Sequence, residues 1–189
     1  MKLTSTATIL DFDPFEVNTG DSAHNLGEQV VLADGRNFRY GKASTTSTVG
    51  KLQLAPAPIP NHVNMVTAAA SLGATQVTVT PAATGGAANI YSEGYLVVNA
   101  SAGLGRSYQV KGHPTISASV AFTVDLFDPI RGVALTSSSR TTLVHNPYNG
   151  FLQGTTATVR GAGVPSTNLA ADDYAFIQTR GVADRKSVV

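Results

Sequence analysis

The chain has 189 residues, enough for one domain or for one domain with an appendage. Charged residues make up 13% of it, only about half the share usual in soluble domains, and the formal net charge is +1. This composition disfavours a coiled coil, a helical bundle and charge-driven disorder. Without a basic excess, nucleic acid is not an expected partner.

The cysteine count and the hydropathy pattern exclude further kinds of site and segment. The chain has no cysteine, so it has no disulfide framework and no thiolate metal site. The segment Met1–Thr6 lacks the apolar core of a secretory signal, and no run approaches the ~18 apolar residues of a membrane span. We therefore expect no membrane partner. The abundant Thr, Val, Gly and Ser favour short strands joined by tight turns.

The N-terminal part is interpreted as an extended arm over residues 1–28, followed by a hairpin and a Pro-rich spacer over 29–62. In the hairpin, Asp34-Gly35 separates strand-like runs at 29–33 and 36–40. This dipeptide predicts a type I′ turn, in which both central residues have positive φ. Phe38 and Tyr40 share one face of the second strand, because side chains alternate with a period of two.

Residues 43–62 form a predicted hinge, with a stiff spacer at 55–60 that contains three prolines. We place a domain boundary here and a β domain over 63–149. Its predicted strands are 76–80, 94–98, 106–111, 120–126 and 140–145. The pattern predicts that Val120, Phe122, Val124 and Leu126 face the core together.

The predicted fold class is all-β, a small sandwich or barrel of short antiparallel strands. The one helix-like patch, 68–72, is stopped early by Gly73. Residues 150–183 are predicted to add C-terminal strands, including one at 174–179. We expect this last strand to lack a partner, because the C-terminus is expected to be truncated.

The expected truncation rests on the last six residues, 184–189. Their sequence, Asp-Arg-Lys-Ser-Val-Val, is the translation of a common short-read sequencing adapter up to its stop codon. Such a scar is excluded from fold reasoning. The codons at 184–189 test this hypothesis, since different codons would end it.

The sequence contains no recognisable catalytic, cofactor-binding or metal-binding motif. The four histidines (24, 62, 113 and 145) lie at no metal-ligand spacing, so each is interpreted as a surface or loop residue. The paired carboxylates at 11/13, 125/128 and 172/173 are interpreted as structural, because they flank turns or precede a strand. We therefore predict no enzyme activity.

Four aromatic residues lie outside the predicted β domain: Phe12, Phe15, Phe38 and Tyr40. A short arm cannot bury four large aromatic side chains by itself. They must dock either on the β domain of the same chain or on a neighbouring subunit, and the sequence leaves both alternatives open. These four are the candidate interface residues.

The order of several segments resembles that of virion proteins of tailed bacteriophages. The segments that carry this resemblance are 34–43 with the spacer 55–60, 91–98, 103–113, 143–150, 163–165 and 174–181. Together they span residues 30–183. The resemblance supplies no catalytic residues.

The resemblance implies a non-enzymatic capsid decoration (cement) protein, found on the capsid surface after synthesis in the bacterial cytoplasm. Its implied partners are the major capsid protein and copies of itself, in a homo-oligomer such as a trimer. Two alternatives stay open: a head-fibre or tail component, and a carbohydrate-binding or hydrolytic β domain. The absence of Trp weighs against sugar binding.

Overall fold

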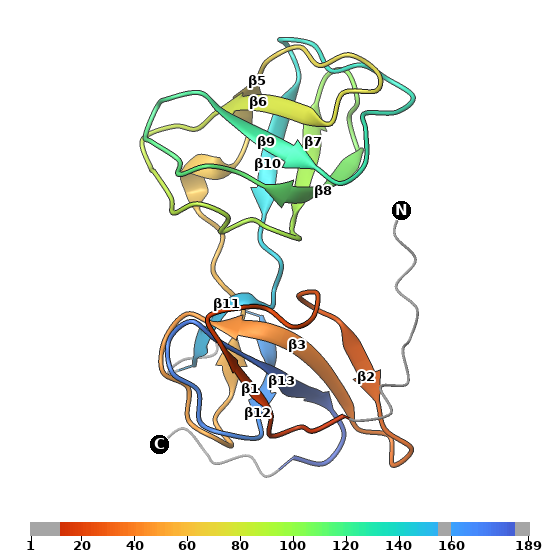
Figure 1. Ribbon diagram of the computed structural model, residues 1–189. Helices are drawn as coiled ribbons and strands as arrows, with labels where there is room; N and C mark the ends of the chain where they lie inside the picture. Colours follow the sequence, from red (N-terminus) through yellow and green to blue (C-terminus); the bar gives the residue numbers. More distant parts are fainter. Residues whose placement is uncertain (1–11, 155–159, 184–189) are drawn as a thin grey trace. The chain divides into compact units, whose positions relative to one another are not determined.

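The computed structural model describes residues 12–154 and 160–183 (Figure 1). Its regular secondary structure is almost entirely β-strand, with loops between the strands. The chain divides into two compact units. Unit 1 combines the residues up to Ala57 with those from Pro147 onward, and unit 2 is Pro58–Asn146. The division falls inside the Pro-rich spacer, and the all-β fold class is confirmed.

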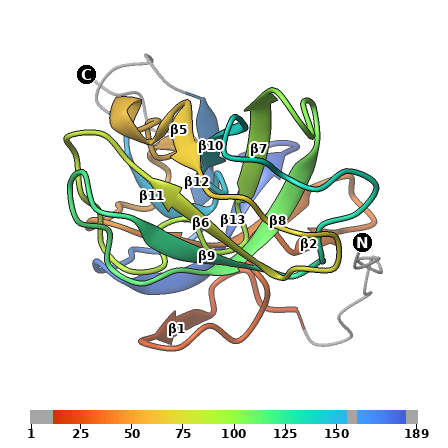
Figure 2. The ribbon, with the colours of Figure 1, turned by 90° about the horizontal axis from the view of Figure 1, so that it is seen from above.

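Unit 2 is a closed barrel of antiparallel strands in the order β10-β5-β6-β9-β8-β7. The strands are β5 (Met65–Thr67), β6 (Gln76–Thr80), β7 (Tyr95–Ala100), β8 (Ser107–Gly112), β9 (Phe122–Leu126) and β10 (Arg140–Val144). Alternate residues of these strands point inward and form one apolar core. The ring can be followed in Figures 1 and 2.

The barrel of unit 2 has two different ends. The chain enters at Pro58 and leaves at Asn146, and β5 starts where β10 stops, so both connections lie at one end, here called the linker end (Figure 1). The other end, the loop end, carries the connections 68–75, 101–106 and 127–139. The one helix of the described residues, the 3-10 helix η1 (Pro60–His62), lies at the linker end.

Unit 1 contains a second closed ring. Its strands are β3 (Asn37–Ala43), β11 (Asn149–Gln153), β4 (Gln53–Leu54), β12 (Gly161–Pro165) and β13 (Asp173–Arg180). They pair in that order, and a β13–β3 pairing joins the two ends. The β3–β11 pair is parallel, which the prediction of antiparallel strands did not include.

Two further short strands lie outside this ring. β1 (Val17–Thr19) pairs with β13, and β2 (Gln29–Val31) pairs with β3. Residues 12–31 thereby join unit 1, so the described part of the predicted arm is not separate from the hairpin and the C-terminal strands. The rest of the arm and the predicted adapter residues 184–189 lie outside the described residues.

Unit 1 buries apolar side chains in two clusters because β3 and β13 are covered on both faces. Phe151, Leu169 and Ile177 belong to the first cluster. Phe38, Tyr40 and Phe176 belong to the second. The expectation that the strand near 174–179 lacks a partner is wrong, because β13 pairs with β1, β12 and β3.

Two local predictions in unit 2 also need correction. Val120 is exposed and precedes β9, while Phe122, Val124 and Leu126 face the core as expected. The patch 68–72 is not helical: its central residue, Ala70, forms a β-bridge with Leu135. In the described part of the chain, no helix is long and apolar enough to cross a membrane.

The hairpin exists, but its turn is not type I′. Gly35 has a φ of 86°, whereas Asp34 does not have positive φ. The amide of Gly35 donates to the Leu32 carbonyl, and the amide of Leu32 donates to the Arg36 carbonyl. This is a three-residue loop with glycine in the left-handed position. The Asp34 carboxylate accepts hydrogen bonds from the backbone amide and the Nε of Arg36.

Replacing Gly35 by alanine is expected to destabilise unit 1 by ~1–2 kcal/mol. A Cβ at this position meets no atom within 4 Å, so the cost comes from backbone strain alone. Gly35→Asn is the matched control and should cost clearly less, because asparagine tolerates this conformation. Urea unfolding measures both variants, and equal losses would contradict this explanation.

Candidate functional site

The four candidate interface aromatics do not behave alike. Phe38 and Tyr40 are fully buried, so they are corrected from interface to core residues of unit 1. Phe12 is half-buried against the rings of Phe38 and Phe176, with centroids 5.1 and 5.0 Å apart. Phe15 is 65% exposed and is the only one of the four that a partner could reach freely.

Phe12, Phe38 and Tyr40 dock within their own unit, and not on the β domain as one expected alternative required. The sequence missed the reason, which is Phe176 of β13. Its ring lies 5.0 Å from that of Tyr40, and the Tyr40 hydroxyl donates to Asn18 Oδ1 at 2.7 Å. Burial raises the pKa of Tyr40, which therefore stays neutral in ordinary buffers.

Four exposed apolar side chains lie in the connections at the loop end of unit 2. The four are Leu72, Leu104, Phe127 and Val133, and their exposed fractions run from 40% for Val133 to 66% for Leu104. They come from all three connections at that end. We call these four residues the apolar rim.

Contacts between the three connections hold the apolar rim in place. The amide of Gly73 donates to the Ile130 carbonyl, and the amide of Ile130 donates to the Ala74 carbonyl, which ties 68–75 to 127–139. The Ser139 hydroxyl donates to the Ala102 carbonyl at 2.8 Å, which ties 127–139 to 101–106. The rim is therefore a fixed feature of the fold, at the end opposite the linkers.

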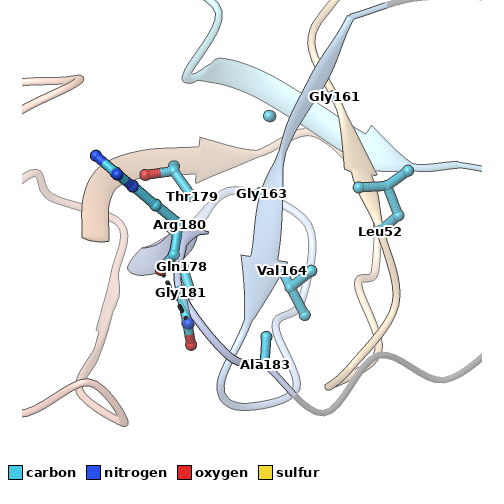
Figure 3. Close-up of a pocket in the computed structure, with 10 residues that line it drawn as sticks. Leu52, Gly161, Gly163, Val164, Gln178, Thr179, Arg180, Gly181 and Ala183 are labelled. Carbon is cyan, nitrogen blue, oxygen red and sulfur yellow. Dashed lines mark hydrogen bonds between the residues drawn. The ribbon is translucent and has the colours of Figure 1, made fainter. Parts of the chain in front are cut away.

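A pocket of about 350 Å³ lies in unit 1 between β12 and the end of β13 (Figure 3). Its glycines and Val164 leave few side chains to recognise a ligand. The side-chain amide of Gln178 donates to the backbone carbonyls of Arg180 and Val182, so its N–H groups are not available to a ligand. The Arg180 side chain extends away from Val164 in Figure 3. The pocket does not direct polar groups at a common point.

Two aspartates of unit 1, Asp13 and Asp173, hold backbone amides in place. Asp13 accepts the Phe15 amide, and Asp173 accepts the Ala170 amide and the Thr19 hydroxyl. Asp172 lies 2.7 Å from Lys42 Nζ. These contacts match the structural role predicted for the pair at 172/173.

Three of the four histidines are not at the surface, although His113 and His145 do lie in loops, so the interpretation as surface or loop residues holds for these two only in its second half. His62 and His113 are buried, and His145 is half-buried with its Nε2 enclosed. All three surround Tyr91, with ring centroids 5.6, 5.6 and 4.3 Å from the Tyr91 ring. We call His62, Tyr91, His113 and His145 the histidine cluster.

The histidine cluster arises from topology. His62 ends η1, His113 follows β8 and His145 follows β10, and all three of these points lie at the linker end. His24 lies elsewhere, in unit 1, against Tyr40 and 3.5 Å from Glu28. Within residues 12–154 and 160–183, no group of three or more His, Cys, Asp or Glu side chains is arranged to hold a metal ion.

Comparison with protein-family models, curated proteins and solved structures finds no match to this chain.

Proposed function

We propose that the protein is a non-enzymatic structural protein of a tailed-phage virion, which decorates and stabilises the capsid. The proposal extends the resemblance carried by segments of residues 30–183. The observation that supports it most is the apolar rim of unit 2, where Leu72 and Leu104 are each more than half exposed. Burying such exposed apolar side chains against a partner would be favourable.

The expected partner of the apolar rim is the major capsid protein. Burying a leucine or phenylalanine side chain contributes about 1.5–3 kcal/mol. Part of this gain offsets the lost freedom of the bound subunit. Each contact is therefore weak alone, and its effect on the capsid comes from many copies on one lattice, where each bound subunit links capsid proteins.

Binding to capsids is expected to depend on the rim leucines. We expect wild-type protein to sediment with capsids of the phage that encodes it, and the double variant L72S/L104S to bind at least about 10-fold more weakly. The matched control is Val120→Ser, because Val120 is 55% exposed but lies in the connection 113–121 at the linker end.

Two results would contradict the proposal. One is a wild-type protein that stays in the supernatant at every capsid concentration. The other is L72S/L104S binding as tightly as Val120→Ser, which would move the contact away from the rim. Mass photometry of the unbound protein tests the proposed trimer separately, since a monomer at all concentrations would remove self-association from the proposal.

A further inference from the structure

The hydrogen bonds of the histidine cluster fix where each imidazole proton lies. His62 Nε2 is 3.0 Å from the carbonyl oxygen of Thr84, which can only accept, so Nε2 carries the proton. His62 Nδ1 is then an acceptor and receives the Tyr91 hydroxyl at 2.7 Å. Because the Tyr91 hydroxyl also accepts hydrogen bonds, this contact fits both the neutral and the protonated form of His62.

The other two rings, His113 and His145, are held in the neutral form. His113 Nδ1 donates to the Pro114 carbonyl at 2.7 Å, so its Nε2 accepts the Tyr91 amide at 3.2 Å. His145 Nδ1 donates to the Ile90 carbonyl at 3.1 Å. Its Nε2 is then a bare acceptor, enclosed and without a hydrogen-bond partner in the described structure.

Adding a proton to His113 or to His145 breaks this arrangement. On His113, the new N–H would point at the Tyr91 amide N–H. On His145, it would lie in an enclosed place that holds no acceptor, which is costly for a charged group.

Neighbouring groups do not offset the added charge. The charge effects that act on His145 come from His62 and His113, and the one that acts on His113 comes from His62. β9 contributes the apolar ring of Phe122 against His113. The turn 89–94 carries Tyr91 and Glu93. The backbone carbonyl of Glu93 accepts a hydrogen bond from the side-chain amide of Asn146. Two protonated rings would therefore repel each other.

We propose that the histidine cluster is an acid-sensitive closure of the linker end of unit 2, which holds this end together when neutral and releases it when protonated. The released part would include both points where the chain joins unit 2, at Pro58 and Asn146. The strand segments near the loop end lie away from these rings and would stay paired. This inference is independent of the proposed function, because it concerns the barrel alone.

The direction of the pH dependence follows from burial. Burial lowers the pKa of His113 and of His145 below the ordinary histidine value of about 6.5. Below that pH, the opened chain binds more protons than the closed one. The closure is therefore fully stable above about pH 7 and weakens as the pH falls through 6.5 toward the lowered values.

Hydrogen exchange of the full chain at pH 7 and pH 5, followed by mass spectrometry, tests this inference. After correction for intrinsic exchange, peptides covering 89–94 and 58–64 should exchange at least about 10-fold faster at pH 5, whereas β6 should change little. The variant His145→Gln keeps a donor for Ile90 and removes the titrating ring, so it should lose most of this acceleration.

His24→Gln is the matched control, because His24 lies in unit 1, and it should keep the full acceleration. Equal protection of the linker end at both pH values would overturn the inference, as would an undiminished acceleration in His145→Gln. If His145→Gln does not fold at pH 7, His113→Gln takes its place under the same criteria. If both variants fail to fold, proton NMR of the wild-type histidine C2 protons decides the matter. Titration of His113 and His145 at or above pH 6.5 would overturn the inference, and titration of both below that pH would support it.

Discussion

Phe176→Ala is expected to destabilise unit 1 by about 3–5 kcal/mol. The Phe176 ring is 3% exposed. It lies among the rings of Phe12, His24, Phe38 and Tyr40, which together with it are called the aromatic cluster. Its centroid is 5.0 Å from Phe12, 5.0 Å from Tyr40 and 5.2 Å from His24. Removing it leaves a cavity between β13 and residues 12–31, which the surrounding rings cannot fill.

Phe15→Ala is the matched control, because it makes the same chemical change at a side chain that is 65% exposed. It should shift stability by less than about 0.5 kcal/mol. Urea unfolding measures both values, and limited proteolysis should cut Phe176→Ala faster in residues 12–31. A Phe176→Ala protein within ~1 kcal/mol of wild type would show that the aromatic cluster contributes little.

Gly94→Ala is the second change with a large expected effect, about 3 kcal/mol or more in unit 2. A Cβ on Gly94 would overlap the Val144 carbonyl oxygen and lie 2.9 Å from the Asn146 nitrogen. It would also lie 3.0 Å from the Tyr91 carbonyl oxygen. All three are backbone atoms, so no side chain can move aside, and the chain next to the histidine cluster must shift.

The control for this change is Gly161→Ala, where a Cβ meets only Leu52 Cδ1 at 3.7 Å. Here alanine should be neutral or should stabilise by about 0.4–1 kcal/mol, since it restricts the unfolded chain. The melting temperature should thus fall for Gly94→Ala and should stay the same or rise for Gly161→Ala. Equal melting temperatures would mean that the backbone approach at Gly94 is not tight.

Local pattern was enough to predict most strands of unit 2. β6 matches its predicted range, and the alternation Phe122, Val124, Leu126 identifies the buried face of β9. β4 has two residues and β1 has three, too short for any periodicity to appear. Val120 continues the alternation in sequence but lies before the strand begins, so period alone could not exclude it.

Long-range pairing explains the larger errors. The ring of unit 1 closes through pairs such as Tyr174 with Lys42, and all of unit 2 lies between these residues in sequence. The sequence correctly placed Phe38 and Tyr40 on one face, but nothing nearby indicated Phe176 as their cover. Loop-closing contacts of this kind are set by the whole fold.

The histidine cluster was missed because the search considered spacing along the chain. A signal was present: His113 and His145 each follow a strand, β8 and β10, and both strands run toward the same end of an antiparallel barrel. Knowing the strand order would have brought the two residues together. His62 could not be added from the sequence, because it precedes β5, which has three residues and was not among the predicted strands.

Cryo-electron microscopy of particles of the encoding phage tests the central claim most directly. The account predicts repeated density for this chain on the capsid, with Leu72 and Leu104 of the apolar rim against the major capsid protein. Particles that lack the chain, or that carry it with the apolar rim facing solvent, would contradict the account.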